Sequence, residues 1–84
     1  MELRETVEMM NSADFKERFR AEYFQTKIRY EKLKKMCNKY EAGTLNFTPA
    51  CPLELLRKQQ GHMDLYLQDL EIRAEIEEIN LEEE

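Results

Sequence analysis

The stretch "RFRAEYFQTKIRYEKLKKMCNKY", residues 18–40, repeats apolar or aromatic side chains at alternating intervals of four and three residues. Side chains at this spacing share one face of an α-helix, as they do in heptad-based helix packing. The stripe therefore predicts a long helix that packs one face against another helix. Its members are Phe19, Tyr23, Thr26, Tyr30, Leu33, Cys37 and Tyr40.

Signals for a start and a stop stand at the two ends of this helix. Asp14 followed by Glu17 has the spacing of a capping box, in which the first side chain accepts from free amides and the second reaches back. Gly43 stands where a left-handed residue commonly closes a helix. We predict a helix over residues 14–42.

A second helix is predicted from "LELLRKQQGHMDLYLQDLEIR", residues 53–73, where the spacing again alternates between three and four. Pro52 precedes this stretch and suits the first helical position, since its missing N–H would be unpaired there. Glu54 falls in the first turn, where the helix dipole favours an acid. We predict a helix over residues 52–79.

Polar residues occupy two positions of this second stripe, whose members are Leu56, Gln59, Met63, Tyr66, Leu70 and Arg73. If the stripe faces the first helix, Gln59 and Arg73 are buried. A buried guanidinium must be paired. The expected partner across the two helices is Glu22 or Glu31.

The chain is expected to form a single domain of the all-α class, residues 1–84. Apolar residues at helical spacing in "MELRETVEMM" predict a short helix over residues 1–11. The connector, residues 43–51, is short enough to join the two long helices as an antiparallel hairpin. The acidic end, residues 80–84, is expected to fray.

Each long helix also carries apolar side chains away from its main stripe. These are Phe24 and Ile28 on the first helix, and Leu65, Ile72, Ile76 and Ile79 on the second. Surplus apolar surface on a small helical chain is typical of an association face. We therefore expect the hairpins to associate as a homo-oligomeric helical bundle.

The net charge of −5 is divided unevenly along the chain. Residues 15–40 carry nine Lys or Arg against three acids, whereas residues 53–84 carry three against ten. Opposite charges of this kind favour two helices that lie side by side. A nucleic-acid-binding domain is usually basic overall, so nucleic acid is disfavoured as a partner.

Several other classes of protein are disfavoured by the composition. No apolar run approaches the roughly 18 residues needed to cross a bilayer, and no apolar segment behind a basic N-terminus resembles a signal peptide. With only Cys37 and Cys51, we expect a reducing compartment and free thiols. Together with His62, the single histidine, they do not form a zinc site. We expect no catalysis, no metal and no other cofactor.

Ligand binding is a more plausible activity, because aromatic and basic side chains alternate along the first helix. Aromatic rings stack on nucleobases, and Lys or Arg side chains neutralise phosphates. Most of these aromatics lie on the apolar stripe, where Tyr and Phe are more often core residues than a ligand platform. Both interpretations stay open at the level of the sequence.

Two segments resemble the phage hairpin domain of anti-CBASS and anti-Thoeris signal sponges. They are "RFRAEYFQTKIRYEKLKKM", residues 18–36, and "ELLRKQQGHMDLYLQDLEIR", residues 54–73. The resemblance covers nearly the whole hairpin. It is carried by Arg18, Glu22, Tyr23, Arg29, Lys32 and Leu33 on the first helix, and by Leu55, Leu56, Gln59, Met63, Tyr66, Leu70 and Arg73 on the second.

This resemblance implies a phage protein that sequesters the cyclic di- or trinucleotides of bacterial immune signalling, in the cytoplasm of the infected bacterium. It implies a short N-terminal helix before the hairpin and assembly into oligomers such as hexamers. For such a ligand, the candidate binding residues are Tyr23 and Phe24 for base stacking, and Arg18, Arg20, Lys35 and Lys39 for phosphate. The alternative is a protein–protein interaction module that inhibits or regulates a host or phage protein.

Overall fold

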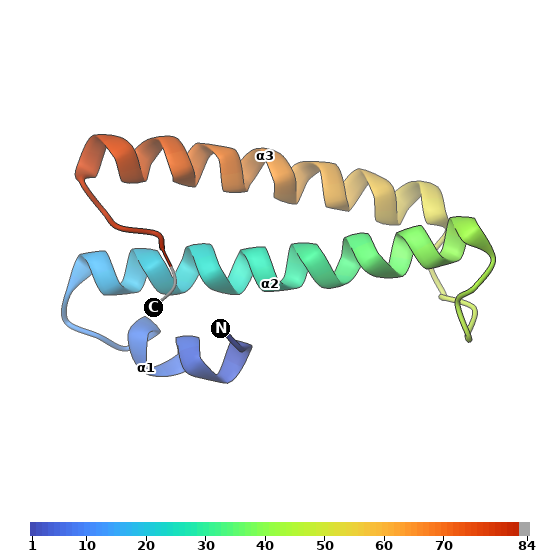
Figure 1. Cartoon of the computed structure of the whole chain (residues 1–84), viewed down its shortest axis with the longest axis horizontal. Helices are drawn as coiled ribbons and strands as arrows, with labels where there is room; N and C mark the ends of the chain where they lie inside the picture. Colours follow the sequence, from blue (N-terminus) through green and yellow to red (C-terminus); the bar gives the residue numbers. More distant parts are fainter. Residues whose placement is uncertain (83–84) are drawn as a thin grey trace.

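Two long antiparallel helices form most of the computed structural model, which describes residues 1–82 (Figure 1). Helix α2 spans Phe15–Ala42 and helix α3 spans Leu53–Glu77. A single 3-10 turn, η1 (Leu3–Glu5), leads into the short helix α1 (Thr6–Met10). The described residues are therefore all-helical, and the predicted hairpin with a short N-terminal helix is confirmed.

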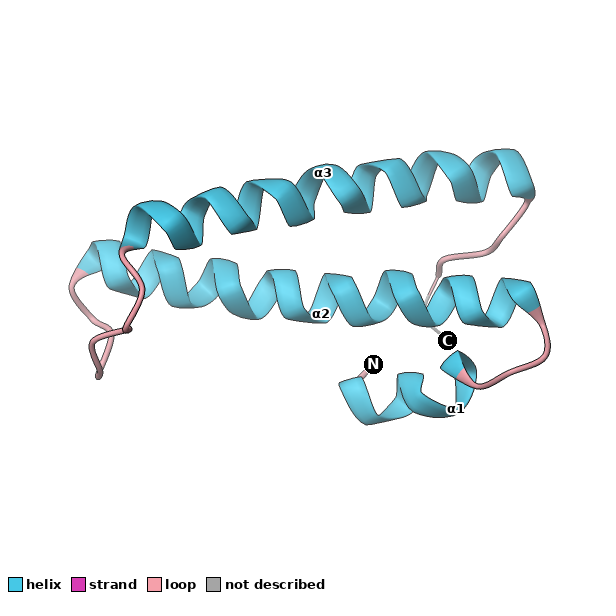
Figure 2. Cartoon of the chain, turned by 180° about the vertical axis from the view of Figure 1, so that it is seen from behind, coloured by secondary structure: helices cyan, strands magenta, loops and turns pink. Residues whose placement is uncertain are grey.

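Helix α2 lies in the middle of the structure, with α3 along one side and α1 against the other (Figures 1 and 2). The molecule is elongated, with extents of 43 × 24 × 20 Å. The connector occupies one end of the hairpin. The N-terminal segment and the end of α3 both lie at the other, so only that end has more than two layers.

The ends of α2 follow the sequence signals in part. The Asp14 side chain accepts a hydrogen bond from the Lys16 backbone amide at 3.0 Å. The reciprocal half of the predicted capping box is absent within residues 1–82, because the Asp14 amide donates to the Ser12 hydroxyl instead of to Glu17. Gly43 closes the helix at φ 76°, in the left-handed conformation that favours glycine.

Helix α3 begins and ends close to the predicted positions. Pro52 is extended at ψ 149° and caps the helix, so Leu53 is its first residue. The helix ends at Glu77, two residues earlier than expected, because Glu78 turns to φ 57°. The Ile79 amide then donates to the Ala74 carbonyl at 2.8 Å and bends the chain back toward α2.

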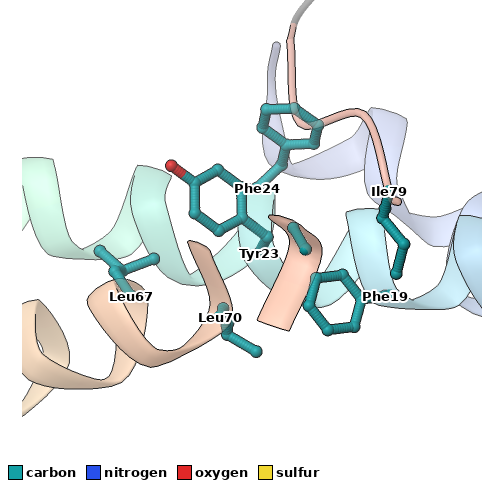
Figure 3. Packing of buried hydrophobic residues seen from close by; sticks show 7 residues of the cluster. Phe19, Tyr23, Phe24, Leu67, Leu70 and Ile79 are labelled. Carbon is teal, nitrogen blue, oxygen red and sulfur yellow. The ribbon is translucent and has the colours of Figure 1, made fainter. Parts of the chain in front are cut away.

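The core lies at the end of the hairpin where α1 packs, as Figure 3 shows. The predicted stripe of α2 is confirmed, because Phe19, Tyr23 and Cys37 are buried and its other members are partly buried. The buried cluster consists of Phe19, Tyr23, Phe24, Leu67, Leu70, Ala74 and Ile79.

The face of α3 that meets α2 differs from the prediction. Leu67, Leu70 and Ala74 are buried, whereas the predicted Tyr66 and Arg73 are exposed. Gln59 is exposed as well. Both stripes pass through Leu56, Met63 and Leu70, so the sequence spacing fits either. Burying Leu67 and Ala74 desolvates no polar side chain, and this explains why their stripe is the one that packs.

Two other expectations are corrected by the end of the chain. We expected residues 80–84 to fray and Ile79 to lie on an association face. Instead, Ile79 is only 6% exposed and lies beside Phe19, and Leu81 packs against the same cluster (Figure 3). Residues 83 and 84 lie outside the described part of the chain.

Phe24 was also expected on the association face, and it is buried within the single chain at 1% exposure. Its ring lies on the side of the cluster away from Leu67 and Leu70 (Figure 3). This is the side on which the N-terminal segment packs against α2. The surplus apolar surface of α2 is therefore covered by the chain itself, whereas that of α3 stays largely exposed.

Candidate ligand-binding site

Two tyrosine–glutamate hydrogen bonds connect α2 and α3. The Tyr23 hydroxyl donates to Glu71 Oε2 at 2.7 Å, and the Tyr66 hydroxyl donates to Glu22 Oε1. Burial and the hydrogen bond to Glu71 raise the pKa of the Tyr23 phenol from 10.0 to about 12. Tyr23 therefore stays neutral and donates over the whole physiological pH range.

Two guanidinium groups stack on the aromatic rings of α2. The Arg20 guanidinium carbon lies 5.5 Å from the centroid of Phe24, and that of Arg73 lies 4.9 Å from the centroid of Phe19. Arg73 also forms an ion pair with Glu77 at 3.1 Å. The predicted pairing of a buried Arg73 with Glu22 or Glu31 is therefore wrong.

A hollow of about 600 Å³ lies where the start of α2, the N-terminal segment and the end of the chain meet. Arg20 donates to the Asn80 carbonyl, and the Lys16 ammonium donates to the Glu78 carbonyl at 3.3 Å. Within residues 1–82 neither cation forms an ion pair. The hollow is lined by Met1, Met9, Asp14, Lys16, Glu17, Arg20, Glu78, Ile79 and Asn80.

A second hollow of about 400 Å³ lies on the other side of the returning segment. It shares Ile79 and Asn80 with the first hollow and reaches Tyr23 and Glu71. Residues 78–82 therefore separate two open spaces that lie beside one aromatic cluster. Carboxylates line both spaces, so an anionic ligand would be held by the cations and repelled by the acids around them.

The structure brings three of the six predicted binding residues together. Arg20 stacks on Phe24, whose ring meets that of Tyr23 at a centroid distance of 5.3 Å and an angle of 76°. Both rings belong to the core, so the core interpretation of these aromatics holds within one chain. Arg18 lies two residues before Arg20, about 200° around the helix axis, and donates to the Ser12 carbonyl at 2.7 Å, which fixes the turn before α2.

Lys35 and Lys39 lie far from this cluster. They are exposed and follow Arg20 by 15 and 19 residues on the same helix. At 1.5 Å per residue, these positions are about 22 and 28 Å from Arg20 along the axis. A small ligand held at Arg20 would leave both lysines without contact unless another copy of the chain supplied them.

Sequence reasoning missed Lys16 and the returning segment. Lys16 and Arg20 stand four residues apart on α2, a spacing that puts two cations on one face. Ile79 and Leu81 stand two residues apart in an acidic segment and could have indicated that this segment packs. Glu71 gave no comparable signal, because it is one of many acids on α3.

The described residues meet neither the requirements of a metal site nor those of a membrane-spanning helix. Between residues 1 and 82, no group of three or more His, Cys, Asp or Glu side chains could hold a metal ion. Cys37 is buried and Cys51 is exposed, and both are free thiols. Among the helices of this part of the chain, none combines the length and the apolar character that a membrane crossing requires.

The fold and this site define a small helical-hairpin protein with a hollow at one end that two cations line. A family model described as Sequestin matches residues 13–76, which include α2, the connector and nearly all of α3. The chain therefore belongs to the Sequestin family. Comparisons with curated proteins and with solved structures gave no match.

Proposed function

We propose that this protein binds and sequesters a cyclic di- or trinucleotide messenger of bacterial anti-phage defence, without catalysis. The observation that carries the proposal is the hollow beside Lys16 and Arg20. Two cations without ion-pair partners in the described chain stand there, and one of them, Arg20, stacks on the ring of Phe24. The cations can neutralise phosphate, and Tyr23, which lines the neighbouring hollow, is the aromatic side chain available to a base.

The family name supports sequestration as the kind of activity, because it indicates a protein that removes a partner from solution. The resemblance of the hairpin to anti-CBASS and anti-Thoeris sponges supports a cyclic nucleotide as that partner. In this proposal the protein is a phage product that acts in the cytoplasm of the infected bacterium. It works by mass action as a homo-oligomer, a hexamer in the form that the resemblance suggests.

A thermal-shift screen against cyclic di- and trinucleotides and isomers of cyclic ADP-ribose tests this proposal. Ligand at about 100 times its Kd should add roughly 2.7 kcal/mol to the free energy of unfolding. For a domain of this size, that raises the melting temperature by about 10 °C or more. After heat denaturation, chromatography should return the ligand chemically unchanged, because sequestration breaks no bond.

Substitutions at the hollow should show whether the ligand binds there or at another basic surface of the protein. Arg20→Gln and Lys16→Gln remove the two cations and should reduce the ligand-induced shift. Lys34→Gln removes an exposed cation of the same helix outside the hollow, so its shift should equal that of the wild type. Equal shifts in all three variants would place the ligand elsewhere on the protein.

The alternative function is a protein–protein interaction module that inhibits or regulates a host or phage protein. The exposed apolar side chains of α3 favour it, since Leu65, Ile72 and Ile76 are 59–75% exposed. The absence of a thermal shift with every nucleotide of the screen would contradict sequestration and favour this alternative. Binding to longer nucleic acid would differ from both, because it weakens steeply with salt as counterions are released.

A further inference from the structure

The outer face of α3 carries a line of exposed apolar side chains that the hairpin leaves without a partner. Leu65, Ile72 and Ile76 are 59%, 60% and 75% exposed. Each stands two residues from a buried side chain of the same helix, which is about 200° around the axis at 3.6 residues per turn. The buried neighbours are Leu67, Leu70 and Ala74. The line therefore faces directly away from α2.

Gly61 continues this line one turn before Leu65, and nothing among residues 1–82 accounts for a glycine there. A Cβ atom added to Gly61 would meet no atom within 4 Å, and the residue does not have a positive φ. Glycine is among the least favourable residues in a helix interior. A glycine on the outer face does, however, leave a notch into which a side chain from another helix can fit.

The spacing of this line is the same in both directions. Gly61, Leu65, Ile72 and Ile76 are separated by four, seven and four residues. We infer that α3 pairs with α3 of a second copy, antiparallel, about a two-fold axis between Gln68 and Asp69. In that register Leu65 faces the partner's Ile72, and Ile76 enters the notch at the partner's Gly61. A self-complementary pattern is what a two-fold interface requires.

The charge distribution along α3 favours the antiparallel arrangement over a parallel one. Residues 53–62 carry Arg57 and Lys58 against one acid, a net charge of +1. Residues 63–78 carry one Arg against six acids, a net charge of −5. In the antiparallel register Arg57 and Lys58 lie within about one turn of the partner's Glu77, whereas a parallel pair places the acidic segments of the two helices together along their whole length.

One feature of the register opposes association. Asp69 lies next to the two-fold axis, so the carboxylates of the two copies approach each other there. Like charges at an interface weaken it, and neutralising them should strengthen it. Asp69→Asn should therefore lower the dissociation constant of the dimer several-fold, as measured by sedimentation equilibrium. A weaker dimer in this variant would contradict the register.

Disulfide trapping distinguishes this register from a parallel one. The background is Cys51→Ser, which removes the exposed thiol, while Cys37 stays buried at 0% exposure. Asp69→Cys in this background should form a disulfide-linked dimer on mild oxidation. Lys58→Cys should not, because its two copies would be about 31 Å apart along the axis in the antiparallel pair. Both substitutions replace exposed side chains of α3.

The cross-linking yields of the two cysteine variants distinguish an antiparallel pair from a parallel pair and from a monomer. Efficient cross-linking of Asp69→Cys but not of Lys58→Cys supports the antiparallel register. Equal cross-linking of both variants would show a parallel pair and overturn it. A wild-type protein that light scattering finds monomeric at about 100 μM, together with no cross-linking, would overturn the interface itself.

Filling the notch gives an independent test in solution. Gly61→Phe places a large side chain where the partner's Ile76 would sit, and open space around the Cβ position spares the monomer fold. It should shift the mass measured by light scattering toward the monomer. Gln59→Phe adds the same side chain to an exposed position of α3 away from the line and should leave the mass unchanged. Association of Gly61→Phe at wild-type strength would contradict the inference.

Discussion

The buried phenol of Tyr23 should make the fold sensitive to alkaline pH, and Tyr23→Phe should abolish this sensitivity. The Tyr23 side chain is in the core, and its hydroxyl donates to Glu71 at 2.7 Å. Burial, followed by the hydrogen bond to Glu71, raises the pKa of Tyr23 from 10.0 to about 12. The folded state therefore keeps its proton at pH values where the unfolded chain has lost it.

The sign and size of the effect follow from this difference in pKa. Because the folded pKa lies above the unfolded value, the stabilisation is complete below pH 10 and is lost as the pH rises through 12. One pKa unit corresponds to 1.36 kcal/mol, so the free energy of unfolding should fall by about 2–3 kcal/mol across this window. That is a large fraction of the 5–15 kcal/mol typical of small domains.

Urea unfolding followed by circular dichroism at pH 8, 10, 11 and 12 measures the effect. Lysines also titrate in this range, so the informative quantity is the difference between the wild type and Tyr23→Phe. At pH 8 the wild type should be more stable by about 1 kcal/mol, the usual contribution of one hydrogen bond. This advantage should shrink above pH 10, reverse at about pH 10.7 and become a disadvantage of about 1 kcal/mol at pH 12. A difference that stays constant from pH 8 to pH 12 would refute the reasoning.

Two further substitutions in the core, each with an exposed control position, test the packing around α2. Ile79→Ala should lower the free energy of unfolding by about 2–4 kcal/mol, since it empties a buried position. Leu55→Ala, at a 51% exposed position, should change it little, and equal losses in urea titrations of the two variants would show that the returning segment is not packed. Cys37→Ala should cost roughly 1–2 kcal/mol and Cys51→Ala nearly nothing, because only the first thiol is buried. Neither cysteine change should alter a ligand-induced thermal shift, and a loss of that shift would assign the thiol to the site.

The hairpin was predictable because one apolar stripe runs along most of the length of α2. Its seven members follow one register from Phe19 to Tyr40, and all of them are buried or partly buried. The glycine at position 43 and the acid at position 14 then mark the ends of the helix through local backbone chemistry. Local signals of this kind act within one turn, and they do not depend on the rest of the fold.

The packing face of α3 was not predictable, because two registers share half of their members. One register adds Tyr66 and Arg73, and the other adds Leu67 and Ala74. The second is chosen because it buries side chains without polar groups. The first leaves Tyr66 and Arg73 at the edge of the hairpin, where they reach Glu22 and the ring of Phe19. Which stripe of α3 packs therefore depends on the side chains of α2 that lie opposite each of its positions.

The candidate site depends on contacts still more distant in the sequence. Arg20 and Lys16 meet the carbonyls of Asn80 and Glu78, which are about sixty residues away in the chain. No local pattern encodes such a meeting, so the site was predicted as a set of residue types on one helix. The core was likewise incomplete without Ile79, which closes it from outside both long helices.

The family match does not cover all of the residues that line the larger hollow. The matched residues, 13–76, contain the hairpin and both cations, Lys16 and Arg20. The remaining walls of the larger hollow come from Met1 and Met9 before the match and from residues 78–80 after it. The family match therefore covers the two cations of this chain but only part of the lining of the hollow. In the proposed function, the two terminal segments shape the space beside the cations, and the hairpin holds these segments together.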